Sequence, residues 1–218
     1  MSDNERRDSV VRYTAEVRTN HWLNAIAFVL AALSGLALFH PALFWFSNLF
    51  GGGPWTRILH PFIGLAAALF FLLLAVAVWG DNRMAPSDWQ WLRQWRDVVD
   101  NREDRLPEVG RYNAGQKLLF LVIVIGMVGL VLSGLVIWRA YFAHYFPVGL
   151  IRFASLVHAL CAFALIVAIL IHVYAALWVK GSVHAMVRGT VTPGWAWKHH
   201  RAWFRQITHA AHPRTGPD

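Results

Sequence analysis

The sequence predicts an all-α integral membrane protein built around a bundle of four transmembrane helices. Of its 218 residues, 57% are hydrophobic and 15% are charged, a balance that ordinary soluble domains do not show. Four uncharged stretches are each long enough to cross, as a helix, a hydrocarbon layer about 30 Å thick. They span residues 22–39, 58–79, 118–138 and 153–179.

The basic residues predict how these helices are oriented. Seventeen of the 20 Lys and Arg residues lie before the first stretch, between the second and the third, or after the fourth. The other two connections hold only Arg57, Arg139 and Arg152. Because cytoplasmic segments of membrane proteins are enriched in Lys and Arg, both termini are expected in the cytoplasm. The net charge of +8 is therefore a topology signal, which favours contact with anionic membrane lipid and argues against nucleic acid as a partner.

The polar segments complete the predicted organisation. Residues 1–20 form a cytoplasmic N-terminal segment, residues 21–180 the four-helix domain, and residues 181–218 a basic cytoplasmic tail. Tryptophans in the connection at 80–116 and in the tail predict surface helices that lie along the cytoplasmic face. Residues 214–218 are expected to be disordered.

Four histidines lie inside the apolar stretches or at their ends. His158 and His172 share the fourth stretch, and their separation of 14 residues places both rings on nearly the same helix face, about 21 Å apart along the axis. His21 and His60 lie at the ends of the first and second stretches. Because ionisable side chains are costly inside a bilayer, they usually mark a functional site.

Chain direction predicts the depth of each histidine. The first stretch starts in the cytoplasm, so His21 is expected near the inner surface, and the second starts outside, so His60 is expected near the outer surface. In the fourth stretch, His158 is outer and His172 inner. The depth-matched pairs are then His60 with His158 and His21 with His172. Two imidazoles at each depth predict two b-type haems, whose six-coordinate iron suits electron transfer. The alternative is that each ring is buried and hydrogen-bonded to a neighbouring helix.

Small residues near the histidines are compatible with a bulky planar group. Gly64 follows His60 by four residues, and alanines flank both histidines of the fourth stretch at the same spacing, although alanine is common in membrane helices. The tetrapeptide Leu-Ser-Gly-Leu also occurs twice, at 33–36 and at 132–135, near the external ends of the first and third stretches. Its small residues let a planar group or another helix approach the backbone.

Two arginines precede candidate ligands by three residues, Arg18 before His21 and Arg57 before His60. Each shares a helix face with its histidine and is a candidate partner for a haem propionate. Snorkelling of the side chain to the membrane interface explains the same positions equally well.

The remaining histidines and the single cysteine are expected to have other roles. Those in the external connections and in the tail are interpreted as surface residues, and the run from Lys198 to Arg201, which includes His199 and His200, as a basic surface patch. Cys161 lies in the middle of the fourth stretch and is expected to be a packing residue.

The chain resembles the cytochrome b (gamma) subunits of respiratory formate dehydrogenases of the N type. The resemblance runs from about residue 18 to residue 205 and rests on several motifs. They are Asn20-His21-Trp22, Arg57-Ile-Leu-His60-Pro61-Phe62, Tyr112-Asn113-Ala-Gly115-Gln116-Lys117, the segment 138–147, Ile171-His172 with Tyr174, and Trp178-Val-Lys180-Gly181-Ser182. The wider cytochrome b561-like group shares the plan of four helices and two haems, but is expected to lack the Asn-Ala-Gly-Gln-Lys stretch.

The resemblance implies the same ligand pairs as the depth argument, with a periplasmic and a cytoplasmic haem. It further implies a site for menaquinone or ubiquinone formed by Asn113, Gly115 and Gln116, with His172 close by. The two amides can donate to a quinone carbonyl, and Gly115 allows close approach. Without the resemblance, Asn113 would first be interpreted as a helix N-cap.

The resemblance also implies partners and a location in the bacterial inner membrane. The partners are an iron–sulfur subunit and a molybdenum- or tungsten-containing catalytic subunit, both on the periplasmic side, and a higher oligomer of that complex is left open. By itself the chain would not be an enzyme; it would pass electrons from the iron–sulfur subunit through two haems to quinone at the cytoplasmic side. The alternatives are a cytochrome b subunit of a hydrogenase or of another quinone-reducing dehydrogenase, and a membrane anchor or transporter without a cofactor.

Overall fold

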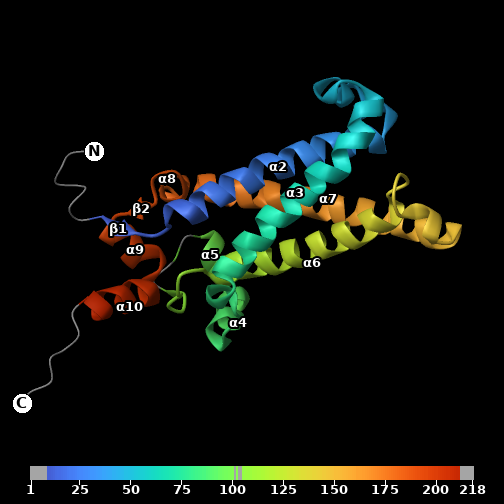
Figure 1. Cartoon of the computed structure of the whole chain (residues 1–218). Coiled ribbons are helices and arrows are strands. Elements are labelled where there is room, and N and C mark those ends of the chain that lie inside the picture. The colour runs from blue at the N-terminus through green and yellow to red at the C-terminus, as the bar shows by residue number, and fades with distance from the viewer. Residues whose placement is uncertain (1–8, 101, 103–104, 212–218) are drawn as a thin grey trace, which may run out of the picture. The chain divides into compact units, whose positions relative to one another are not determined.

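The computed structural model describes residues 9–100, 102 and 105–211 (Figure 1). These residues fall into two compact units. The bundle unit comprises residues 16–77 and 121–175. The loop unit comprises the described parts of 1–15, 78–120 and 176–218. The predicted disorder of residues 214–218 lies outside the described residues.

Four long apolar helices supply the bundle unit. They are α2 (Ala15–Phe39), α3 (Gly53–Val78), α6 (Ala114–Ile137) and α7 (Val148–Trp178). Each is long and apolar enough to cross a membrane, so the predicted fold class is confirmed. All four begin before the uncharged stretch that predicted them. The reason is that a helix continues through polar residues at the membrane interface, where its backbone hydrogen bonds are still satisfied within the segment.

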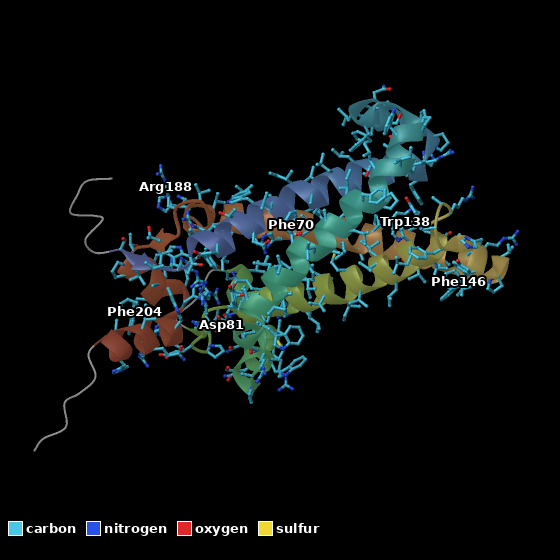
Figure 2. All side chains as sticks on the ribbon, in the orientation of Figure 1. Phe70, Asp81, Trp138, Phe146, Arg188 and Phe204 are labelled. Atoms are coloured by element: carbon cyan, nitrogen blue, oxygen red, sulfur yellow. The ribbon has the colours of Figure 1, made fainter. Side chains whose placement is uncertain are left out.

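The distribution of side-chain size in the bundle unit is that of a membrane protein. Small residues are buried between the helices, among them Ala27, Ala37 and Ala67. Side chains project outward along the helices (Figure 2). The exposed large apolar residues include Leu69, Leu72, Phe163 and Leu170. Close helix contact through small residues, with leucine and phenylalanine outside, is favourable in lipid and unfavourable in water.

Two glycines bring α6 close to α7. A Cβ atom at Gly126 would lie 2.7 Å from the Leu165 side chain, and one at Gly129 would lie 2.6 Å from Cys161 Sγ. Leu165 is almost fully buried at this contact. Cys161 is a free thiol that occupies the space above Gly129, which agrees with a packing role.

The connection between α2 and α3 contains a ten-residue 3-10 helix, η1 (Pro41–Phe50). It ends at Gly51 and Gly52, whose φ angles of +85° and +94° lie in the left-handed region that glycine adopts without strain. The second connection in the bundle unit contains η4 (Ala143–Tyr145). Trp138 packs edge-on against Phe62, with ring centroids 5.3 Å apart.

The loop unit contains short helices, as the sequence predicts, and a two-stranded ladder that the sequence does not predict. Its helices are η2 (Gly80–Asn82), α4 (Pro86–Arg93), α5 (Trp95–Val99), α8 (Ser182–Arg188), α9 (Pro193–His199) and α10 (Arg201–Ala211). Strand β1 (Val10–Val11) pairs antiparallel with β2 (Thr190–Val191). Two residues per strand are too few for a detectable alternation of apolar and polar residues.

A buried arginine lies at the centre of the loop unit. Arg12 is 2% exposed; its guanidinium donates to the Arg111 carbonyl and to His200 Nε2, the latter at 3.0 Å. The same group lies 4.8 Å from the centre of the Trp203 ring and 5.2 Å from that of Trp195, within cation–π range.

The surface role expected for His200 is therefore wrong. The chain turns from α9 into α10 at this residue, and its ring, 3% exposed, faces Arg12. Since Arg12 is the donor, Nε2 accepts, and His200 Nδ1 donates to the Gly110 carbonyl at 2.8 Å. Burial, with the nearby Arg12 charge as a second cause, lowers the pKa of His200 to about 3, so the ring is neutral.

Candidate cofactor sites

His60 of α3 and His158 of α7 face each other in the bundle unit. Their ring centroids are 6.2 Å apart and their planes are inclined by 79°. One iron ion bound by both rings would hold the two ligating nitrogens about 4 Å apart, and each nitrogen lies about 1 Å from its ring centre, which gives about 6 Å between centroids. The spacing thus fits two axial imidazoles on one iron.

Each ring of this outer pair is in contact with a serine through Nδ1. Ser34 Oγ lies 2.9 Å from His60 Nδ1, and Ser133 Oγ lies 3.0 Å from His158 Nδ1. Both hydroxyls also donate their proton to carbonyls of their own helices, Ser34 to that of Ala31 at 3.0 Å. A hydroxyl that donates its one proton to the carbonyl keeps free lone pairs, so its oxygen can accept from Nδ1–H. The lone pair of each ring is then on Nε2, where a metal can use it.

Glycines provide room beside the outer pair. A Cβ atom at Gly35 would lie 3.1 Å from His60 Cε1, and one at Gly134 would lie 3.4 Å from His158 Cε1. A Cβ atom at Gly64, one turn after His60, would have no atom within 4 Å. The space beside Gly64 is therefore compatible with the edge of a planar ligand.

His21 of α2 and His172 of α7 form the second pair. Their ring centroids are 6.4 Å apart and the planes are inclined by 51°, so this spacing also fits one iron. The surroundings differ from those of the outer pair, because His21 Nδ1 is buried with no hydrogen-bond partner among the described residues. Next to it, Asn20 Nδ2 donates to the Phe70 carbonyl at 2.9 Å and ties α2 to α3.

The donor set favours a macrocycle over a bare metal ion. Within the described part of the chain, no three His, Cys, Asp or Glu residues converge to bind a metal. Two imidazoles leave most coordination positions of an iron ion empty, and a porphyrin supplies the four that are missing. The residues present therefore fit b-type haem.

The two arginines considered for haem propionates both lie on these helices. Arg18 is partly buried on α2, and Arg57 is exposed on α3. Pairing with a propionate stays a prediction for both.

The predicted quinone residues Asn113, Gly115 and Gln116 lie in the loop unit at the start of α6, whereas His172 lies in the bundle unit. Asn113 Oδ1 accepts from Gln116 N at 2.9 Å, and Gln116 Oε1 accepts from Asn113 N at 3.0 Å. This reciprocal pair is a capping box, the structural alternative for Asn113. The cap uses only the amide oxygens, so both amide NH2 groups keep their capacity to donate to a ligand.

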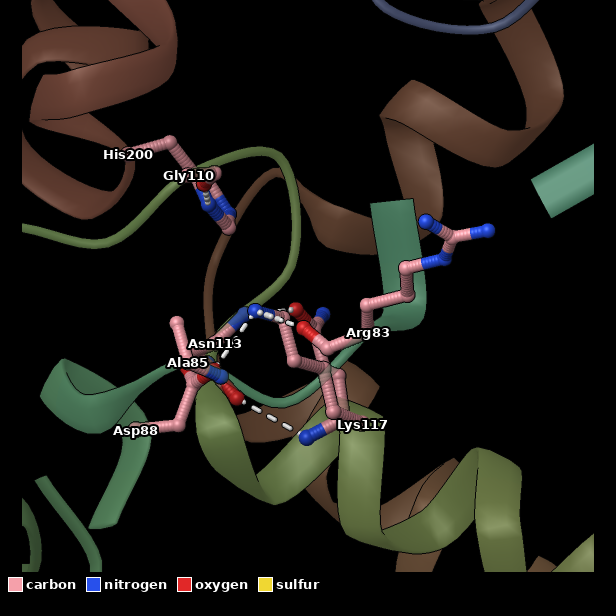
Figure 3. Close-up of polar contacts among 8 residues, drawn as sticks. Arg83, Ala85, Asp88, Gly110, Asn113, Lys117 and His200 are labelled. Carbon is pink, nitrogen blue, oxygen red and sulfur yellow. Dashed lines mark hydrogen bonds and ion pairs between the residues drawn. The ribbon is translucent and has the colours of Figure 1, made fainter. Parts of the chain in front are cut away.

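A buried ion pair lies beside this cap (Figure 3). Lys117 Nζ lies 2.7 Å from Asp88 Oδ2 and donates to the Arg83 carbonyl at 3.0 Å. Asp88 also accepts from Ala85 N at the start of α4. The pair therefore fixes the first turn of α4 to the first turn of α6, and Trp91 of α4 lies against Gly115, 3.4 Å from a Cβ atom built there.

The sequence does not predict the contacts of the two serines of the outer pair. Their signal is the repeated Leu-Ser-Gly-Leu tetrapeptide, which by itself indicates only that a planar group or another helix can approach the backbone. The serine contacts depend on the register between helices, and a single sequence does not give that register.

Comparison with known proteins identifies a family and several relatives. The model of a family described as prokaryotic cytochrome b561 matches residues 12–189. The chain is 45% identical over 203 residues to the formate dehydrogenase cytochrome b556(fdo) subunit of Escherichia coli K12, covering 93% of this chain and 95% of that protein. It is 42% identical over 201 residues to the nitrate-inducible cytochrome b556(Fdn) subunit of the same organism, covering 92% and 93%. The identity to the formate dehydrogenase cytochrome b556 subunit of Haemophilus influenzae is 37% over 197 residues, covering 90% and 83%.

Proposed function

Because the chain belongs to the prokaryotic cytochrome b561 family, we propose that it is the di-haem membrane subunit of a formate dehydrogenase. Family membership implies b-type haem, and the four apolar helices make the chain a multi-pass membrane protein. Its named relatives are cytochrome subunits, which transfer electrons rather than catalyse the oxidation of substrate. The observation that carries the number of haems is the presence of two histidine pairs with ring spacings of 6.2 and 6.4 Å.

The proposed axial ligands are His60 and His158 for the outer haem, and His21 and His172 for the inner one. Bound haem supplies one-electron redox chemistry at each position. Two imidazoles on each haem would leave no coordination position for oxygen or another small ligand, which suits electron transfer. The serines hold the two outer imidazoles in the tautomer that presents Nε2.

The proposed direction of electron transfer is inward across the bacterial inner membrane. Electrons come from an iron–sulfur subunit that receives them from a molybdenum- or tungsten-containing catalytic subunit on the periplasmic side. They leave to menaquinone or ubiquinone on the cytoplasmic side. The uneven distribution of Lys and Arg supports a cytoplasmic position for both termini, and the names of the relatives support formate dehydrogenase as the complex.

The proposed quinone site uses the start of α6. The NH2 groups of Asn113 and Gln116 donate to a quinone carbonyl, while their oxygens cap the helix. The Trp91 ring lies against Gly115, and an indole ring at this position can stack on an aromatic head group. His172 belongs to the bundle unit, and its part in quinone binding stays a prediction from the resemblance.

The test is a haem count and an inventory of co-purifying subunits. The wild-type complex should contain two b-type haems per chain together with an iron–sulfur subunit and a formate-oxidising subunit. His158→Ala should lose one haem and electron entry from formate. Two haems in that variant would contradict the ligand assignment. Co-purification with a hydrogenase would instead identify the chain as a cytochrome b subunit of that enzyme.

A further inference from the structure

The two Leu-Ser-Gly-Leu segments at 33–36 and 132–135 each lie against one histidine of the outer pair. The first segment is on α2 and contacts His60 of α3; the second is on α6 and contacts His158 of α7. In each, the serine binds Nδ1 and the following glycine faces Cε1 of the same ring. The repeated tetrapeptide therefore makes the same contact twice, once with each histidine of one candidate haem site.

Both serines are positioned to act as acceptors. Ser34 is 0% exposed and Ser133 is 6% exposed, so water does not compete for either hydroxyl. Each hydroxyl donates its proton to a carbonyl of its own helix, and the oxygen that remains accepts from the imidazole. The bond to the backbone fixes the rotamer of the serine, and the serine in turn fixes the rotation of the ring.

An acceptor at Nδ1 changes the chemistry of the ligand as well as its orientation. Partial withdrawal of the Nδ1 proton makes Nε2 a stronger donor. A stronger axial donor stabilises ferric over ferrous iron and so lowers the reduction potential. His21 has no acceptor at Nδ1 among the described residues, so the inner pair lacks this effect on at least one ligand.

We propose that Ser34 and Ser133 are positioning residues that orient both outer imidazoles and lower the reduction potential of the outer haem. This rests on the proposed function, in which His60 and His158 hold that haem. A lower outer potential favours transfer from the outer haem to the inner one, which is the proposed direction of flow. Gly35 and Gly134 provide the close approach that each serine contact requires.

The test is an optical redox titration of the purified complex with Ser34→Ala and Ser133→Ala. In each variant, the equilibrium constant for reduction of one haem should increase three- to tenfold. At 59 mV per tenfold for one electron, the reduction potential of that haem rises by about 30–60 mV. The other haem should not change. His158→Ala and His172→Ala identify the two haems, since each removes a different one.

Ser155→Ala is the matched control. Ser155 is also on α7, and its hydroxyl donates to the Ile151 carbonyl at 2.8 Å in the same way, but it is exposed to the surroundings of the bundle. Both potentials should stay at their wild-type values in this variant.

Two results would overturn the proposal and leave the haem assignment intact. One is an unchanged outer potential in both alanine variants with both haems bound. The other concerns an alanine variant that loses the outer haem. Ser34→Thr and Ser133→Thr restore the hydroxyl and should recover this haem at its wild-type potential. If neither threonine variant recovers it, the missing hydroxyl is not the cause of the loss. A His158→Ala variant with both haems would instead overturn the proposed function.

Discussion

At the level of single residues, a substitution at Gly64 distinguishes an effect on the fold of the chain from an effect on a bound ligand. An added Cβ atom there meets no protein atom within 4 Å, so Gly64→Ala should leave the fold of the chain unchanged. If a porphyrin edge lies in that space, the same methyl group should lower the occupancy of the outer haem, to about half or less, through steric overlap. The ratio of haem to protein checks this, with helix content by circular dichroism as the control. Full haem content would place the porphyrin elsewhere.

The cap at the start of α6 allows the two roles of its amides to be separated. Asn113→Asp and Gln116→Glu keep the oxygen that caps the helix but remove the NH2 donor. Both variants should retain two haems and formate-dependent haem reduction, while reduction of quinone falls roughly tenfold, in line with about 1–1.5 kcal/mol for a lost hydrogen bond. Steady-state quinone kinetics measure the effect. Unchanged kinetics in both variants would leave the amides with a capping role alone.

Single residues also show what the sequence could and could not predict. The pairing of His60 with His158 and of His21 with His172 was predicted, because basic residues fix chain direction and direction fixes depth. The structure brings the same rings together. The contacts of Ser34 and Ser133 and the burial of His200 were not predicted, since each depends on how one element is rotated against another.

At the level of helices, α6 and α7 depend on the absence of side chains at two positions. Gly126→Ala places a methyl group 2.7 Å from the Leu165 side chain, which is too close, so that side chain or the helix backbone must shift. Overpacking of this kind costs about 1–3 kcal/mol, so the thermal unfolding midpoint should fall by several degrees. Gly149→Ala, on α7 with no atom within 4 Å, is the control and should have no such effect. Equal midpoints for the two variants would contradict the close contact.

The short helices of the loop unit should lose stability in acid through His200. The pKa of its ring is about 3 in the folded state against 6.5 for a free histidine, so the unfolded chain binds the proton first. The stabilisation is complete above about pH 6.5 and decreases as the pH falls toward 3, by up to about 1.4 kcal/mol per pH unit. Unfolding midpoints between pH 7 and pH 5 measure the slope.

His200→Gln is the informative variant, because an amide can replace both hydrogen bonds of the ring without titrating. Its pH slope should be shallower than that of the wild type. His184→Gln, which changes an exposed histidine of α8, should keep the wild-type slope. Identical slopes in all three proteins would assign the acid sensitivity to other groups.

The helices themselves were largely predictable, and their ends were not. Hydropathy identified all four long helices, since only a continuous apolar segment satisfies its backbone inside a bilayer. It placed the start of α2 too late, because the charged first turns of that helix carry no hydropathy signal. The ladder of β1 with β2 joins residues about 180 positions apart, and the local sequence of neither strand predicts it.

For the whole molecule, similarity shows the family, and the geometry of the histidine pairs supports the candidate haem sites. Membership of the prokaryotic cytochrome b561 family implies b-type haem in a multi-pass membrane protein. The identity to formate dehydrogenase cytochrome b556 subunits extends over more than nine-tenths of this chain. The number of haems and their ligands depend on the two histidine pairs.

The most direct test of that dependence is the haem count in two double variants. His60→Ala with His158→Ala removes both ligands of one proposed site, so one haem per chain should remain. His60→Ala with His172→Ala removes one ligand from each site, so no haem should remain at full occupancy. The opposite result, in which the first variant loses both haems and the second retains one, would contradict the pairing and the account built on it.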